Sequence, residues 1–259
     1  GTEGVRGVGG VEAELCFLGT GAAIPSKYRN VSAVLLRVQP ATGPVDAAEK
    51  RSGDVASGGE GGGMRAMLLD AGEGTLGSLR RRFGSSVDAV LLGMQMVWVS
   101  HIHADHHLGL ISVLHRHTLL RHTSSGSFRA APPLLVVGPR SLQTWLQLST
   151  AALQSCIEFR FVHCAAAPNS PIVSAALTRL GVSSLHVAPA EHCADAWAVG
   201  VQRACGGGSG FSVVYSGDTR PCDAVVRLGQ KVSSGRLILI HEATFDDSEA
   251  MQLEAVQRR

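Results

Sequence analysis

The residues best suited to chemistry lie in one short run, SHIHADHH, at positions 100–107. Because alternate residues of an extended chain point to the same side, His101 and His103 can face one cation. The turn that follows directs Asp105 and His106 toward a second cation. Neutral imidazole suits zinc, and a carboxylate can join the shell of either ion. The run therefore predicts a binuclear metal site, since a histidine-rich surface loop would need neither a preceding buried strand nor a carboxylate at this offset.

Two later residues complete the predicted site. His192 follows a strand-like run, and Asp218, in the sequence YSGDT, stands where a strand ends in a glycine turn. A carboxylate in such a place can bridge two cations about 3.5 to 4 Å apart, and such a pair lowers the pKa of a shared water and stabilises the oxygens of an in-line displacement. The set predicts hydrolysis. Taken alone, His192 is slightly more typical of a surface or core histidine than of a ligand, and Asp218 is equally typical of a turn-forming aspartate.

The elements that must position these side chains alternate between strand and helix patterns. Strand-like segments occur at residues 14–18, 32–38, 67–70, 96–100, 134–139, 184–188, 197–202, 211–215 and 237–240, and helical patterns occur at 76–83, at 108–121 and from 141. The alternation predicts an α/β chain of two packed sheets with helices outside. The Gly-rich residues 1–12 are predicted to be a disordered leader, and residues 39–63 a disordered surface insertion between two strands.

Composition narrows the class of protein. The chain has 259 residues, of which 45% are hydrophobic and 17% charged, as in ordinary globular proteins. No stretch reaches the roughly 18 apolar residues of a membrane span, and no secretory signal is visible, so we expect no membrane partner. The six cysteines lack a CxxC pair and predict reduced thiols in an intracellular protein. A net charge of +2 is too small to argue for nucleic-acid binding by itself.

Four further motifs carry a resemblance to a known family. They are FLGTGAAIPSKYRNVS at 17–32, LDAGEGT at 69–75, YSGDTRPC at 215–222 and IHEATF at 240–245. With the histidine run they resemble the metallo-β-lactamase superfamily and, more narrowly, the tRNA 3′-end processing endonucleases of the tRNase Z family. The PSKYRN loop is specific to that family, because other hydrolases of the superfamily are not expected to carry it.

The resemblance implies a fold and an activity. The fold would be the metallo-β-lactamase fold, an αββα sandwich of two mixed sheets with helices on the outer faces, formed by residues 13–259. The activity would be that of a zinc-dependent endoribonuclease, which removes the 3′ trailer of precursor tRNA when metal-activated water attacks a phosphodiester.

The resemblance also assigns roles to residues. One zinc would be held by His101, His103 and His192, the other by Asp105 and His106, with Asp218 bridging the two. Asp105 would also act as general base, and Glu242 would orient a catalytic histidine. The loop around the acceptor stem of the tRNA would use Lys27, Arg29 and Asn30 as substrate-binding residues.

The chain departs from the family pattern in two places. Family members continue into a His-Ser-Thr segment and then a strand that ends in Asn-His-Phe-Ser-Gln-Arg, whereas this chain stops at Arg259. We therefore expect a domain truncated at its carboxy terminus, a second zinc site that lacks one protein ligand, and little activity of this piece alone. Residues 139–184 hold no Gly/Pro-rich arm of the kind that short forms use to grip tRNA. This absence favours the carboxy-terminal catalytic half of a long form, with an amino-terminal half-domain or a second copy as partner, in the nucleus or the mitochondrion.

Two alternatives stay open at the level of sequence. The first is a hydrolase of a small thioester or cyclic phosphodiester, which would have no use for the cationic loop at Lys27 and Arg29. The second is a catalytically inactive tRNA-binding homologue, which the missing carboxy-terminal histidines would produce. The sequence does not decide between zinc and manganese as the physiological metal.

Overall fold

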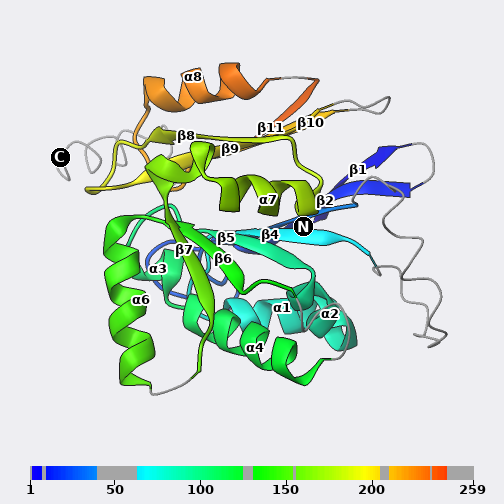
Figure 1. Cartoon of the computed structure of the whole chain (residues 1–259). Coiled ribbons are helices and arrows are strands. Elements are labelled where there is room, and N and C mark those ends of the chain that lie inside the picture. Colours follow the sequence, from blue (N-terminus) through cyan, green and yellow to red (C-terminus); the bar gives the residue numbers. More distant parts are fainter. Residues whose placement is uncertain are drawn as a thin grey trace.

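The strands of the described residues form two sheets packed face to face, with most of the helices on the outer faces (Figure 1). The computed structural model describes residues 2–7, 10–39, 63–124, 131–153, 156–204, 210–233 and 235–243. The first sheet has the order β1-β2-β3-β4-β5-β6-β7, and the second has the order β11-β10-β9-β8. Both sheets are mixed, because β4 to β7 are parallel and β1 to β4 antiparallel, while β11 is parallel to β10 and β8 to β10 are antiparallel. The predicted sandwich of two mixed sheets is confirmed.

The bounds of the elements follow the order of the chain. The first sheet consists of β1 (Thr2–Gly7), β2 (Gly10–Gly19), β3 (Ala33–Val38), β4 (Arg65–Leu69), β5 (Met94–Trp98), β6 (Leu134–Gly138) and β7 (Phe159–His163). The second sheet consists of β8 (Ser184–Pro189), β9 (Trp197–Arg203), β10 (Phe211–Tyr215) and β11 (Arg236–Ile240). The helices are α1 (Thr75–Phe83), α2 (Val87–Leu92), α3 (Ala104–His107), α4 (Leu110–Thr123), α6 (Arg140–Ala152), α7 (Pro171–Leu180) and α8 (Asp223–Val232), with 3-10 turns at Gly84–Ser86 and Cys164–Asn169.

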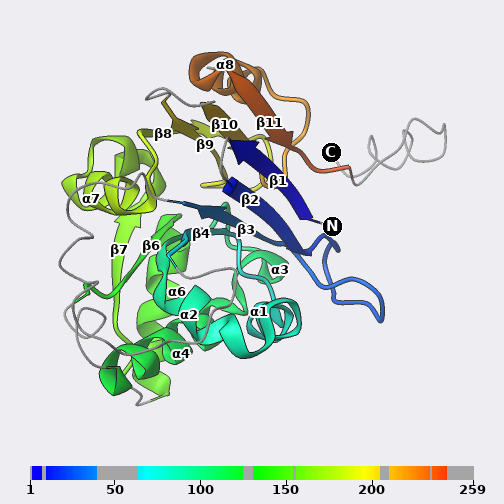
Figure 2. The ribbon, with the colours of Figure 1, turned by 90° about the vertical axis from the view of Figure 1, so that its right-hand side faces the viewer.

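Alternation along the strands divides the core into layers. In β4, Met67 and Leu69 face the core between the sheets, whereas Leu68 faces the core beneath helices α1, α2, α4 and α6. A third, smaller apolar cluster joins helix α8 to the outer face of the second sheet. Figure 2 shows these layers from the side, with α8 on one outer face and α1, α2, α4 and α6 on the other. The central strands β3, β4, β5, β6 and β10 are therefore buried on both faces, whereas the edge strand β11 is largely exposed.

Helix α7 takes a different position, between the two sheets (Figure 1). Its side chains Val173, Ala176, Leu177 and Leu180 are buried in the same core as the inner faces of both sheets. The helix begins with Pro171 in its first turn and ends at Gly181, which has a left-handed φ of 79°. It fills space between the inner faces of the two sheets.

The structure differs from the sequence prediction near the amino terminus. Residues 2–7 and 10–12 belong to strands β1 and β2, which pair antiparallel, whereas the sequence predicted a disordered leader over residues 1–12. Ladder hydrogen bonds use main-chain groups, so a Gly-rich segment can pair without side chains suited to a core. The predicted insertion at 39–63 falls, from residue 40 to 62, outside the described residues. Among the described helices, none combines the length and the apolar character that crossing a membrane requires.

The predicted site residues follow the ends of strands. Asp70 comes directly after β4, His101 comes shortly after β5, and Asp218 follows β10. The carboxyl ends of parallel neighbours such as β4 and β5 lie at one edge of a sheet, so their loops meet there. The fold therefore brings several short loops together beside one edge of the sandwich.

We predict that Leu180→Ala lowers the free energy of unfolding by about 2–5 kcal/mol, because Leu180 is fully buried between the sheets. Chemical denaturation followed by circular dichroism measures the change. Leu148→Ala is the matched control, since Leu148 is 68% exposed on α6 and its truncation should leave stability nearly unchanged. Equal losses in the two variants would contradict the layered core.

Candidate metal centre

The first group of ligands consists of three imidazoles from two distant loops. His101 and His103 follow β5, and His192 lies in the loop between β8 and β9. Each offers a ligand atom, and these atoms all lie within 4.8 Å of one another. His192 Nε2 is 3.0 Å from His103 Nδ1, although the two residues are 89 positions apart. Nitrogen atoms at this spacing can share one cation.

A second group joins the first through Asp218. His101, His106 and Asp218 also place their ligand atoms within 4.8 Å of one another. The carboxylate of Asp218 lies 3.3 Å from His106 Nε2, 4.0 Å from His101 Nε2 and 3.9 Å from His192 Nε2. It therefore reaches the imidazoles of both groups, as a carboxylate between two cations would.

Asp105 lies beside the second group. Its Oδ2 is 3.5 Å from His106 Nε2 and accepts a hydrogen bond of 2.7 Å from the backbone N–H of Ala23. Burial raises the pKa of Asp105, but hydrogen bonding to His106 and the charge of His106 outweigh it and hold the pKa well below its usual range. The same opposition lowers the pKa of Asp218. Both carboxylates are ionised and available to a cation.

The buried ring of His101 shows that the residues fit a metal ion. The Ser100 hydroxyl donates to Asp70, so its oxygen is left to accept the Nδ1–H of His101, at 3.0 Å. This arrangement leaves Nε2 of His101 with a lone pair, and that atom is buried with no hydrogen-bond partner among the described residues. Burial lowers the pKa of His101 to about 3, so the ring is neutral, as a metal ligand must be. A buried, unpaired acceptor is costly unless a cation satisfies it.

Asp70 orients the ligands from beneath. Its carboxylate is fully buried and accepts hydrogen bonds from Ser100 N (2.7 Å), Ser100 Oγ (2.8 Å) and Tyr215 Oη (2.6 Å). It also lies 2.6 Å from His106 Nδ1, which fixes the opposite nitrogen of that ring toward Asp218. A carboxylate behind a metal-binding histidine is the usual arrangement around such sites.

The pKa of His106 reflects the negative charge of the cluster. Burial lowers its pKa, but the charge of Asp70 and hydrogen bonds to Asp105 and Asp218 outweigh burial and raise the pKa to about 12. Three carboxylates thus surround one imidazole, more negative charge than that ring neutralises, and a cation at its Nε2 would displace the second proton that they stabilise. Such an excess is what bound cations would compensate.

The sequence interpretation assigned no role to Asp70, Ser100 or Tyr215. Asp70 did carry a signal, because it is an acidic residue that directly follows the apolar run 66–69. In the structure it adopts a left-handed conformation, with φ 57°, at the start of the turn that leads to Gly72. Gly72 has no room for a side chain, since a Cβ there would lie 2.1 Å from the Asp105 carbonyl oxygen. The turn after β4 is therefore packed directly against the turn that carries Asp105.

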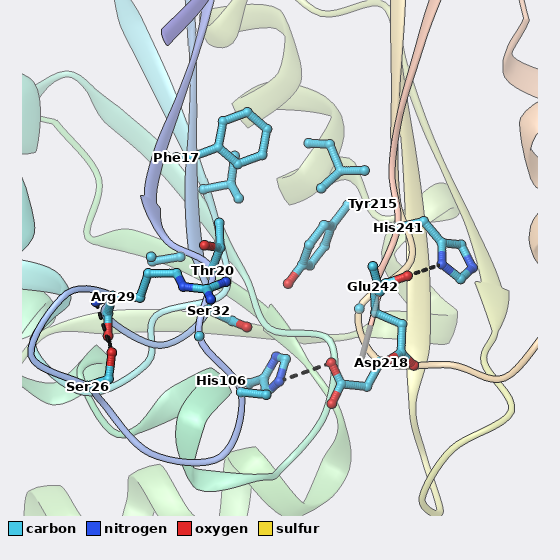
Figure 3. Close-up of a pocket in the computed structure, with 18 of the residues that line it drawn as sticks. Phe17, Thr20, Ser26, Arg29, Ser32, His106, Tyr215, Asp218, His241 and Glu242 are labelled. Atoms are coloured by element: carbon cyan, nitrogen blue, oxygen red, sulfur yellow. Dashed lines mark hydrogen bonds and ion pairs between the residues drawn. The ribbon is translucent and has the colours of Figure 1, made fainter. Parts of the chain in front are cut away.

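A pocket of about 630 Å³ adjoins the cluster. It is lined by His106, Asp218, Tyr215, Arg29 and Glu242 among others, and Figure 3 shows Arg29 on the side opposite Asp218 and Glu242. The pocket therefore has acidic and imidazole groups on one side and a guanidinium on the other. This distribution suits an anionic substrate held between cations and arginine.

The structure separates the three predicted substrate-binding residues. Arg29 lines the pocket, whereas Lys27 and Asn30 are not among the lining residues. The Lys27 ammonium lies over the Tyr28 ring, 5.2 Å from its centroid. Asn30 donates from Nδ2 to the Ser78 hydroxyl at 3.2 Å, which ties its loop to helix α1. Asn30 thus shapes the loop, and Arg29 is the residue that faces the space next to the metal centre.

Glu242 lies at the far side of the same pocket. Its Oε1 accepts a hydrogen bond of 2.7 Å from the backbone N–H of Thr219, the residue after Asp218. His241 points its Nδ1 back to the Glu242 carbonyl oxygen, at 2.8 Å (Figure 3). Glu242 therefore holds the turn that presents Asp218, and its predicted part in orienting a catalytic histidine stays a prediction.

Comparison with known proteins shows which sequences this chain is similar to. No protein-family model matches the chain. The human protein named zinc phosphodiesterase ELAC protein 2 is 37% identical over 256 residues, which are 95% of this chain and 26% of the relative. The fission-yeast protein ribonuclease Z 1 is 34% identical over 241 residues, 92% of this chain and 27% of the relative. The chain thus spans about a quarter of the length of the curated relatives that it matches.

Solved structures identify the architecture. A long form RNase Z from yeast superposes with a TM-score of 0.75 at 24% identity, covering 96% of this chain and 34% of that one. The metallo-β-lactamase fold protein YhfI from Bacillus subtilis superposes with a TM-score of 0.55 at 14% identity, covering 95% of this chain and 92% of that one. The chain has the metallo-β-lactamase fold. The resemblance to ribonuclease Z proteins predicted from the sequence motifs is also confirmed.

We predict that Asp70→Asn weakens zinc binding about tenfold to a hundredfold, because it removes the charge that orients His106. Asparagine tolerates the left-handed backbone of this position, so the turn itself should persist. Competition with a chromogenic chelator measures the affinity. Glu73→Gln is the control, since Glu73 is exposed in the same turn. Unchanged affinity in Asp70→Asn would contradict the assigned role.

Proposed function

We propose that the chain is the catalytic part of a zinc-dependent endoribonuclease that removes the 3′ trailer of precursor tRNA. The observation that carries the proposal is the convergence of imidazoles and carboxylates beside a pocket that Arg29 lines. The similarity to proteins named ribonuclease Z and zinc phosphodiesterase supports the choice of RNA phosphodiester as the bond that is cut.

The proposed site holds two zinc ions. The first would bind His101, His103 and His192, and the second would bind Asp105 and His106, with Asp218 shared between them. When bound, the ions supply an activated water at neutral pH and neutralise the charge that develops on the phosphate oxygens. Imidazole and carboxylate ligands suit zinc, and the same set also accepts manganese.

Residues of the chain would guide the attack. Asp105 is held in place by the Ala23 N–H beside His106, so its carboxylate would lie where it can accept the proton that the attacking water loses. Arg29, on the opposite side of the pocket, can donate two hydrogen bonds to a non-bridging phosphate oxygen pair. Glu242 would hold Asp218 in position while the substrate binds, because it accepts a hydrogen bond from the backbone N–H of the next residue, Thr219.

The proposal includes a partner within a longer protein. The relatives that this chain matches are about four times its length, so the site would work with a further part such as an amino-terminal half-domain. A second copy of the chain is the alternative partner. The compartment, nucleus or mitochondrion, stays a prediction from the sequence resemblance.

We predict that Asp105→Ala in the full-length protein slows cleavage of a precursor tRNA with a 3′ trailer at least about a hundredfold. A chelator should abolish cleavage by the unaltered protein, and added zinc should restore it. Product length on a denaturing gel measures both effects. Asp88→Ala is the control, because Asp88 pairs with Arg116 in helix α4 and takes no part in the cluster.

Three results would contradict the proposal. Cleavage that survives both the chelator and Asp105→Ala would exclude metal-dependent chemistry at this cluster. Metal-dependent hydrolysis of a cyclic phosphodiester or a thioester, with precursor tRNA left intact, would instead favour the small-molecule alternative. Zinc binding with tRNA retention and no hydrolysis of any of these substrates would favour the inactive homologue.

We also predict that Arg29→Ala raises KM for precursor tRNA more than Lys27→Ala does, because only Arg29 lines the pocket. Loss of one phosphate contact should reduce the slope of log affinity against log salt by about 0.7 to 0.9. Filter binding at several salt concentrations measures the slope. A larger effect from Lys27→Ala would contradict the assignment of Arg29 to the substrate.

A further inference from the structure

The segment that carries His192 is a tight loop between β8 and β9. The backbone N–H of Ala190 donates to the Ala196 carbonyl at 2.9 Å and closes residues 190–196 into a turn. His192 lies at the exposed side of this turn, with 30% of its side chain accessible. The His192 ring contacts His101, His103 and Asp218, which are themselves candidate ligands, so the backbone of the turn must help to set its position.

Asp195 anchors this turn to three other groups. Its Oδ2 accepts a hydrogen bond of 2.7 Å from the backbone N–H of Arg140, at the first residue of helix α6. Its Oδ1 accepts a hydrogen bond of 2.6 Å from Trp197 Nε1 and lies 3.1 Å from His163 Nε2, at the end of β7. Burial raises the pKa of Asp195, but these hydrogen bonds outweigh it and lower the pKa, so the carboxylate is charged.

Helix α6 also supports the other loop of the first ligand group. Trp145 in α6 packs edge-on against His107, with ring centroids 4.4 Å apart. His107 Nδ1 lies 2.9 Å from the carbonyl oxygen of His103. The loop with His103 and the loop with His192 therefore rest on the same 13-residue helix, one through Trp145 and the other through its amino-terminal N–H.

We infer that Asp195 is a positioning residue of the metal centre, which ties the His192 turn to helix α6 and so holds His192 beside His103. The two imidazoles stand 3.0 Å apart. Asp195 touches neither the ligand atoms nor the pocket, and acts only through the turn. The inference rests on the proposed metal function. A ligand that is already in place costs less ordering entropy on binding, which raises metal affinity.

The charge of Asp195 makes this tie testable. Three donors converge on one carboxylate, and the helix amino terminus adds a favourable dipole. Asparagine keeps the size of the side chain and tolerates the φ of 62°, but it is neutral and offers one acceptor oxygen in place of two. Alanine would add backbone strain at this φ, so Asp195→Asn is the cleaner variant.

The experiment measures zinc affinity of the full-length protein by chelator competition, together with the rise in Tm that saturating zinc produces. Asp195→Asn should weaken zinc binding about tenfold to a hundredfold and shrink the zinc-induced rise in Tm. Asp88→Asn is the matched control. It removes the same charge from the partly exposed ion pair that Asp88 forms with Arg116, away from the cluster, and should leave zinc affinity unchanged. Trp197→Phe deletes one donor to Asp195 and keeps an aromatic ring, so its zinc affinity should lie between those of the other two variants. It replaces Asp195→Asn in the experiment if that variant does not fold.

Each outcome separates the inference from the proposed function. A lower Tm without zinc, but the same zinc affinity and the same zinc-induced rise as in the unaltered protein, would overturn the inference, since Asp195 would then be purely structural. Weaker zinc binding in Asp195→Asn would support it even if the protein left precursor tRNA intact. A protein that takes up no zinc at this cluster would overturn both.

Discussion

The buried lone pair on His101 Nε2 is the constraint around which the site is built. The described residues offer it no hydrogen-bond donor, while the Ser100 hydroxyl and the Asp70 carboxylate fix the tautomer that leaves it bare. A polar atom in that state costs free energy in the folded protein unless a cation binds it. His103, His192 and Asp218 place their ligand atoms near the same nitrogen, so a metal bound there would satisfy it and offset this free-energy cost.

Asp70 connects this constraint to the fold. It follows β4 in the first sheet and accepts the hydroxyl proton of Tyr215, the last residue of β10 in the second sheet. The two sheets are thus joined beneath the ligands by a charge-assisted hydrogen bond, which is shorter and stronger than one between neutral groups. The strands of the two sheets provide a rigid support, and the short loops after β5, β8 and β10 carry the candidate ligands. This division agrees with the general placing of functional residues on loops above a rigid scaffold.

Much of the fold could be predicted from sequence, because β4, β5, β6 and β10 are mostly apolar segments that are followed closely by a polar residue or a glycine. Helices α7 and α8 were missed although their signals were present: Val173, Ala176, Leu177 and Leu180 have helical spacing after Pro171. The ligand types were visible in one run of the chain, and their grouping with His192 and Asp218 into one ligand set came from the family resemblance. The supporting contacts of Asp70 and Asp195 could not be predicted, since they join residues up to 145 positions apart.

Anomalous X-ray diffraction at the zinc absorption edge, from crystals of the zinc-loaded full-length protein, tests the central claim most directly. The account predicts two peaks about 3.5 to 4 Å apart, the first about 2.0 to 2.1 Å from imidazole nitrogens that include His101 Nε2. The second peak should lie beside His106, with Asp218 between the two. Zinc bound instead to the sulfur of Cys193, or at any place that leaves His101 Nε2 without a metal, would contradict it.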